Sequence, residues 1–206
     1  MELRQRRPAR TYESIGGRSS GTMRYLASPA QLRASLLRWS LFTVPLVLGL
    51  GMLSGIAAGS GPANAWFAVL NKPVLYPPPA TFGIVWSVLY VLMGVALAMI
   101  ISAWGARGRT VAIIFFAVQL LLNLSWSPVF FGLHQTTLAL WIILAMIPLV
   151  LATLFIFFRI RPIAGLLLAP YLAWICFAAF LNWQFVVLNP DSEQIKNSGA
   201  AVRVEL

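Results

Sequence analysis

Acidic residues are scarce in this sequence, and its long apolar runs contain none of them. The chain has 5 Asp and Glu among 206 residues, and charged residues of both signs amount to 10%. A soluble domain carries about 25% charged residues, because its surface needs them to stay hydrated. The low charge therefore argues against a soluble globule, and the 60% hydrophobic content argues against a disordered chain.

Cysteine and histidine occur once each, as Cys176 and His134. A single cysteine leaves no disulfide within the chain and no cysteine-based metal cluster, and a single histidine leaves no histidine-rich site. Because the apolar runs contain no carboxylate, acid–base catalysis and proton relays in a membrane have no side chain to use. We therefore assign no metal site and no catalytic residue from the sequence.

Long uncharged runs dominate the rest of the chain, and the mean hydropathy is +0.83. Each run can cross a bilayer, which takes about 20 helical residues, and none alternates as a barrel strand does. The sequence predicts an all-α, polytopic membrane protein, a five-transmembrane-helix bundle at residues 39–188, with a loop at 59–81. Residues 1–38 are predicted as a basic, largely disordered tail and 189–206 as a polar tail. The predicted spans are 39–58, 82–104, 111–131, 137–158 and 163–188.

The net charge of +10 is distributed unevenly along the chain. Such a basic protein first suggests a nucleic-acid partner, but eight of the fifteen basic residues precede residue 39, where a membrane protein carries its topology signal. With the N-terminus inside, twelve basic residues lie on the inner side and three on the outer side. We therefore expect the lipid bilayer and no nucleic acid as partner, with an N-in, C-out orientation in a bacterial cell membrane. The Arg-rich, Ser-containing start leaves an organelle membrane as the alternative.

The loop predicted at 59–81 is longer than a connection between antiparallel helices requires. It contains an apolar turn around Trp66 and Phe67, then Lys72, and three consecutive prolines at 77–79. Prolines restrict the backbone, so the loop is expected to be ordered. Its aromatic residues are equally consistent with a lid over a binding site and with an anchor in the membrane interface.

Three predicted spans carry aromatic and polar side chains about four residues apart, which places them on one face of each helix. Such stripes can form an apolar pocket with a few orienting polar groups. They can also join helices by hydrogen bonds, and spacing alone favours this second role. The stripes are Phe82, Trp86 and Tyr90; Gln119, Asn123 and the neighbouring Trp126; and Tyr171, Trp174, Ala178 and Asn182.

Small residues form a ridge on the first span, at Gly51, Gly55 and Gly59. Glycines four residues apart allow helices to approach closely in a membrane. The ridge is expected to serve packing within the bundle, with a homodimer contact as the alternative.

Three motifs in order carry a resemblance to a known family. In order and spacing they resemble the TspO/MBR family, the tryptophan-rich sensory proteins, over about residues 40 to 190. This family is similar to the mitochondrial translocator protein, or peripheral benzodiazepine receptor. The motifs are Trp66-Phe67 with Lys72-Pro73, Phe82, Trp86 and Tyr90; Gln119, Asn123 and Trp126-Ser127-Pro128; and Pro170-Tyr171, Trp174 and Leu181-Asn182.

The resemblance implies a five-helix bundle, usually a homodimer, with a pocket beneath the first loop. Family members bind porphyrins such as protoporphyrin IX, with no obligatory cofactor, and are assigned roles in transport, sensing and light-dependent porphyrin breakdown. By motif position, Trp86 and Trp174 correspond to pocket tryptophans linked to that breakdown. The stripes converge on the same residues, which raises the pocket interpretation above interhelical bonding. The predicted ligand-binding residues are Trp66, Phe67, Lys72, Phe82, Trp86, Tyr90, Gln119, Asn123, Trp126, Tyr171, Trp174, Ala178 and Asn182.

The predicted function is a membrane tetrapyrrole-binding sensor or transporter, in which Lys72 meets the propionates of a porphyrin. A light-dependent porphyrin-degrading enzyme is the alternative, and a structural membrane protein without ligand is a further one. The sequence departs from the family at Leu75, where a lid tryptophan is common, and at Phe67, where a tyrosine is common. The vertebrate cholesterol motif needs a tyrosine and then a basic residue, but Trp183 replaces the tyrosine and the next basic residue is Lys196. Cholesterol is therefore not expected as a ligand.

Overall fold

The computed structural model describes residues 28–194, and within this part of the chain all regular elements are helices. Five helical segments in it are long and apolar enough to cross a membrane. The all-α, five-span architecture predicted from the sequence is therefore confirmed. The helices are α1 (Pro29–Ala57), α2 (Ala65–Val69), α3 (Pro79–Ile101), α4 (Arg109–Ser127), the π-helical η1 (Pro128–Gly132), α5 (Thr136–Ile160), α6 (Pro162–Leu166) and α7 (Ala169–Leu188).

Helix α1 begins at Pro29, before the predicted start at Trp39. The Ser28 hydroxyl accepts a hydrogen bond from the backbone N–H of Gln31, and the Gln31 side chain accepts one from the Ser28 N–H. This capping box, followed by proline at the first helical position, fixes the start of the helix. The assignment of residues 29–38 to the disordered tail is therefore wrong. Residues 1–27 and 195–206, with the rest of the predicted tails, lie outside the described residues.

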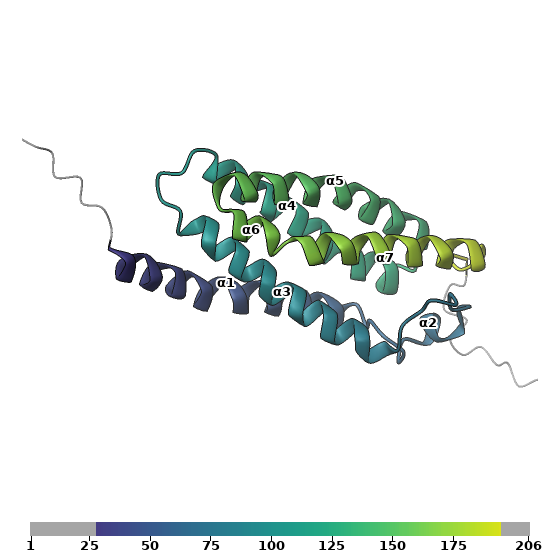
Figure 1. The fold of residues 1–206 in the computed structure, drawn as a ribbon. Helices are drawn as coiled ribbons and strands as arrows, with labels where there is room; N and C mark the ends of the chain where they lie inside the picture. Colours follow the sequence, from purple (N-terminus) through teal and green to yellow (C-terminus); the bar gives the residue numbers. More distant parts are fainter. Residues whose placement is uncertain (1–27, 195–206) are drawn as a thin grey trace, which may run out of the picture.

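The fifth predicted span, residues 163–188, consists of two helices. Pro170 lacks the N–H that would bond the carbonyl of Leu166, so the helix is interrupted between α6 and α7. Gly165 lets α6 pack closely on α5, because a Cβ added there would lie 2.6 Å from the Cβ of Phe158. Figure 1 shows α6 and α7 as consecutive helices joined at this break. Trp174 and Phe185 of α7 line the cavity described below.

Helices α1 and α3 lie side by side (Figure 1). A Cβ at Gly94 would lie 2.6 Å from the Cα of Val44, and the Thr43 hydroxyl donates to the Gly94 carbonyl at 2.8 Å. Farther along α1, a Cβ at Gly51 would lie 2.1 Å from the ring of Tyr90. The first glycine of the predicted ridge therefore packs inside the bundle, where it makes room for an aromatic ring.

Candidate functional site

A cavity of about 470 Å³ lies inside the bundle, at the end where α2 lies beside the last turns of α7 (Figure 1). Helices α1, α3, α4, α5 and α7, the η1 turn and the segment between α1 and α3 all contribute to its wall. None of its lining side chains carries a formal charge. A cavity of this volume, apolar with a few polar groups, is typical of a site for a small molecule.

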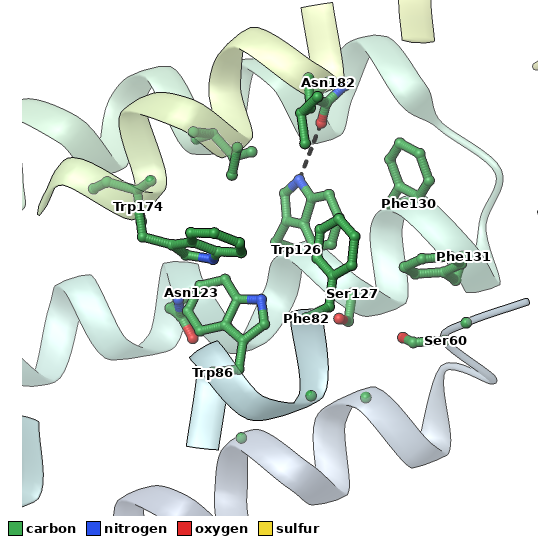
Figure 2. A pocket seen from close by; sticks show the side chains of 18 of the residues that line it. Ser60, Phe82, Trp86, Asn123, Trp126, Ser127, Phe130, Phe131, Trp174 and Asn182 are labelled. Atoms are coloured by element: carbon green, nitrogen blue, oxygen red, sulfur yellow. Dashed lines mark hydrogen bonds between the residues drawn. The ribbon is translucent and has the colours of Figure 1, made fainter. Parts of the chain in front are cut away.

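Two tryptophans form the centre of the aromatic wall. Trp86 of α3 and Trp174 of α7 lie edge to face, with ring centroids 6.5 Å apart at 89°. Trp86 also stacks on Tyr90 at 5.3 Å, and Phe82 packs edge-on against Trp174 at 5.9 Å. Figure 2 shows Trp86 and Trp174 meeting at the cavity from different helices. The fold thus combines two of the predicted stripes into one surface suited to a flat apolar ligand.

Asn123 of α4 connects the cavity wall to the core behind it. The Tyr90 hydroxyl donates to Asn123 Oδ1 at 2.9 Å, and Asn123 Nδ2 donates to the Tyr171 hydroxyl at 3.2 Å. Tyr171 in turn donates to Gln119 Oε1 at 2.9 Å. Asn123 lines the cavity, whereas Tyr171 and Gln119 lie behind it and are almost fully buried. The polar stripe therefore joins the helices and also holds one pocket amide in a fixed orientation.

Two indole N–H groups at the wall differ in their partners. Trp126 Nε1 donates to Asn182 Oδ1 at 3.1 Å (Figure 2). The Asn182 amide in turn donates to the Thr136 carbonyl at 2.9 Å. Trp174 Nε1 is buried and has no hydrogen-bond partner in the described part of the chain. A buried donor left unpaired costs about 1–3 kcal/mol. Trp174, whose ring lines the cavity, therefore carries an unsatisfied donor.

The segment between α1 and α3, residues 58–78, covers the cavity and is called the lid loop below. Asn64 Oδ1 accepts from the backbone N–H of Phe67 at 2.9 Å and so caps the short helix α2. The same side chain donates to the carbonyl of Phe131 at 3.3 Å. Phe67 and Tyr76 line the cavity and pack their rings on Phe185 at 5.5 and 5.9 Å. The loop is ordered, and its aromatic residues form part of the cavity wall.

Lys72 caps the C-terminal end of α2. Its ammonium donates to the carbonyls of Phe67 and Leu70 and lies 4.1 Å from the centroid of the Phe67 ring. These contacts satisfy carbonyls that a helix end leaves without donors. Burial lowers the pKa of Lys72 below its ordinary value. Lys72 lies outside the cavity wall, and its contact with a ligand carboxylate stays a prediction.

Nine of the thirteen predicted ligand-binding residues line the cavity, and the other four lie outside its wall. Whether the nine contact a ligand stays a prediction. Those at the wall are Phe67, Phe82, Trp86, Tyr90, Asn123, Trp126, Trp174, Ala178 and Asn182, and those outside it are Trp66, Lys72, Gln119 and Tyr171.

Sequence reasoning missed part of the wall. Gly51 and Gly55 of α1 belong to it, and the glycine ridge was a signal for them, because small residues leave space beside a helix. Ile143 and Met146 of α5 also line the cavity, and nothing in an ordinary apolar span distinguishes them from its lipid-facing residues.

The fold and the site together define a polytopic helical membrane protein with an uncharged, aromatic cavity under a lid loop. The model of the TspO/MBR family matches residues 42–188, and the chain belongs to this family. It is 36% identical over 154 residues to the Tryptophan-rich protein TspO of Chlorobaculum tepidum. The aligned region covers 73% of this chain and 98% of that protein.

Further relatives come from bacteria and mammals. The Tryptophan-rich sensory protein of Cereibacter sphaeroides is 37% identical over 145 residues. The aligned region covers 66% of this chain and 90% of that protein. The Translocator protein of Bos taurus is 35% identical over 156 residues, and the aligned region covers 75% of this chain and 90% of that protein. The similarity to each extends over most of the membrane domain.

Proposed function

We propose that this protein is a membrane sensor or transporter that binds a tetrapyrrole such as protoporphyrin IX in the cavity. The observation that carries the proposal is the perpendicular pair Trp86 and Trp174 in a cavity without formal charge. A flat macrocycle can stack on one indole while the edge of the other contacts its rim. The names of the relatives, tryptophan-rich sensory protein and translocator protein, agree with sensing or transport.

Polar groups at the wall support an oriented complex. The amide of Asn123, held in place by Tyr90 and Tyr171, lines the cavity and supplies a hydrogen-bonding position. Ionised propionates are costly to bury among uncharged side chains, so they belong at the mouth of the cavity, near the lid loop. No obligatory cofactor forms part of this proposal.

Light-dependent breakdown of the porphyrin is the second candidate function. The observation in its favour is that Trp174, with an unpaired indole N–H, and Trp86 both border the space a macrocycle would fill. Indole side chains can exchange single electrons with a light-excited porphyrin, and dioxygen would be the oxidant that is consumed. A protein that binds porphyrin without this chemistry leaves the ligand intact under light.

Titration of the purified protein in nanodiscs with protoporphyrin IX tests both candidates. Binding predicts saturable quenching of tryptophan fluorescence in the dark, weakened in Trp86→Phe and retained in Trp141→Phe. Trp141 is a matched control because it is 64% exposed and lies outside the cavity wall. A new absorbing product that forms only under light and is lost in Trp86→Phe would favour breakdown. Absence of quenching by a folded protein would contradict both and leave a structural membrane protein.

A further inference from the structure

The chain that leaves α7 folds back onto the lid loop. Residues Asn189–Glu193 pass the end of α2 and then reach the start of α5. They lie outside the cavity wall. We call these five residues the C-terminal latch, because hydrogen bonds join them to the lid loop on one side and to the bundle on the other.

The first contact is a reciprocal pair between Asn71 and Asn189. The backbone N–H of Asn71 donates to Asn189 Oδ1 at 2.7 Å, and Asn189 Nδ2 donates to the Asn71 carbonyl at 3.1 Å. Asn189 Nδ2 also donates to the carbonyl of Phe185 at 3.0 Å. One amide thus joins the lid loop to the end of α7, and its two bonds to Asn71 fix the direction of the loop where it leaves α2.

The second contact is buried. Trp66 Nε1 donates to the Ser192 carbonyl at 2.9 Å, and both residues are less than a tenth exposed. The Trp66 ring also stacks on His134 at 4.5 Å. Trp66 precedes Phe67, which lines the cavity, so a bond that holds Trp66 also holds the residue covering the site.

The third contact anchors the latch to the bundle. The Glu193 carboxylate accepts from the backbone N–H of Thr137 at 2.8 Å and from the Thr136 hydroxyl at 3.2 Å. Helix α5 has no side-chain cap from its own N-cap residue, Gln135, so Glu193 supplies this cap from the far end of the chain. An anion at the N-terminus of a helix is favourable, because the helix dipole and the unpaired N–H groups both attract it.

We propose that the C-terminal latch positions the lid loop and thereby sets how long a ligand stays in the cavity. The proposal rests on the proposed function, because it assumes a ligand beneath the loop. The latch residues lie outside the wall, so they act through Trp66 and Asn71 as positioning residues. Opening the lid requires breaking the buried Trp66 bond and the Asn71–Asn189 pair. Both release and entry should therefore become faster without the latch, and the Kd should change less than the release rate.

Three variants test the latch in full-length protein in nanodiscs. Trp66→Phe removes the bond to Ser192 and keeps an aromatic ring, and Asn189→Ala removes the pair with Asn71. Trp183→Phe is the matched control, since Trp183 is half-exposed on α7 and lies outside the cavity wall and the latch. Release of protoporphyrin IX into excess lipid vesicles is followed by its absorbance. We expect about fivefold faster release for each bond lost and the wild-type rate in the control.

Hydrogen exchange of the lid amides in the ligand-free protein supplies an independent readout. Amides between Asn64 and Lys72 should exchange faster in Trp66→Phe and Asn189→Ala, while the melting temperature of the bundle stays close to that of wild type. Asn71→Ala is the control for the pair, because both bonds to Asn189 use the Asn71 backbone and the substitution removes only the 3.4 Å bond from Asn71 Nδ2 to the Leu188 carbonyl. We expect it to speed lid exchange less than Asn189→Ala does.

The outcomes separate the two proposals. If wild-type protein does not bind porphyrin but the variants speed lid exchange, the proposed function fails and the latch still holds the loop. If porphyrin binds and neither release nor lid exchange changes in the variants, the latch proposal is overturned and the proposed function stands.

Discussion

The hydroxyl of Ser54 in α1 donates to the carbonyl of Leu124 in α4 at 2.6 Å. That carbonyl would normally accept from the N–H of residue 128, but Pro128 has none. A side chain from one helix thus supplies the donor that a proline removes from another. At the same place α4 changes into the π-helical η1, whose Phe130 and Phe131 line the cavity.

Ser54→Ala should destabilise the bundle by about 1 kcal/mol, because it removes one interhelical hydrogen bond. Thermal unfolding in nanodiscs measures the change. Ser125→Ala is the control, since the Ser125 hydroxyl bonds the Leu122 carbonyl of its own helix. An equal decrease in melting temperature in both variants would show that the hydrogen bond between α1 and α4 adds nothing to the stability of the bundle.

Asn123→Leu should weaken porphyrin binding roughly fivefold, the effect of losing about one hydrogen bond. The melting temperature should fall as well, because the hydroxyls of Tyr90 and Tyr171 both lose a buried partner. Gln119→Leu is the comparison, since Gln119 lies behind the wall and bonds Tyr171 alone among these residues. We expect it to lower stability and to affect affinity less. If Asn123→Leu binds porphyrin with unchanged affinity, Asn123 serves only to join the helices by hydrogen bonds.

Gly51→Ala should destabilise the protein by about 1–3 kcal/mol, the usual cost of overpacking. Its methyl group would overlap the Tyr90 ring, which would have to shift and thereby disturb its hydrogen bond to Asn123. Gly49→Ala on the same helix is the control, since nothing lies within 4 Å of a Cβ at that position. Thermal unfolding and porphyrin titration of both variants check the prediction. A Gly51→Ala protein of wild-type stability would contradict the role of Gly51 in packing within the bundle. It would favour the alternative, in which the glycine ridge forms a homodimer contact.

The C-terminal latch should weaken at low pH. The backbone N–H of Thr137, with the hydroxyl of Thr136, holds the pKa of Glu193 below its ordinary value. A lowered pKa in the folded state adds stability above the unfolded value, and this stability is lost as the pH falls through the folded value. The difference in melting temperature between wild type and Glu193→Gln should therefore be constant near neutral pH and disappear in acid.

His134 stacks on Trp66, and Asp191 lies in the latch itself. The comparison is therefore repeated with His134→Asn in both proteins. Asparagine suits the positive φ of 58° at this position. If the difference between wild type and Glu193→Gln depends on pH in the same way in both pairs, His134 is not the source of the pH effect.

A reporter fused after Leu206 should be read on the outer side of a bacterial host membrane. The described arginines gather at the end of the bundle where α1 and α4 begin, whereas Lys72, Asp191 and Glu193 lie at the opposite end. Basic residues stay on the cytoplasmic side, so the N-terminus should be inside. A fusion after Gly108, between α3 and α4, is the opposite-side control. A cytoplasmic signal from Leu206 would contradict this orientation.

Local sequence predicted the order of the lid loop but not the contacts that it makes. Consecutive prolines predicted an ordered loop, because proline restricts the backbone wherever it stands. The choice between lid and membrane anchor depended on the direction of Phe67 and Tyr76, and both line the cavity. The reciprocal pair of Asn71 and Asn189 joins positions 118 residues apart, and neither asparagine has a local feature that marks the other.

The number of spans and the polar and aromatic faces of α3, α4 and α7 followed from the residues alone, because hydropathy and the helical repeat act within one segment. The choice of a pocket over interhelical bonding followed from the family resemblance. The tertiary structure decided which stripes meet, since Trp86 and Trp174 become neighbours only when α3 and α7 pack together. It also placed Gln119 and Tyr171 behind Asn123, although all three lie on predicted polar faces. A helical face records that a side chain points away from lipid, but its depth in the bundle depends on the neighbouring helices and is absent from the local pattern.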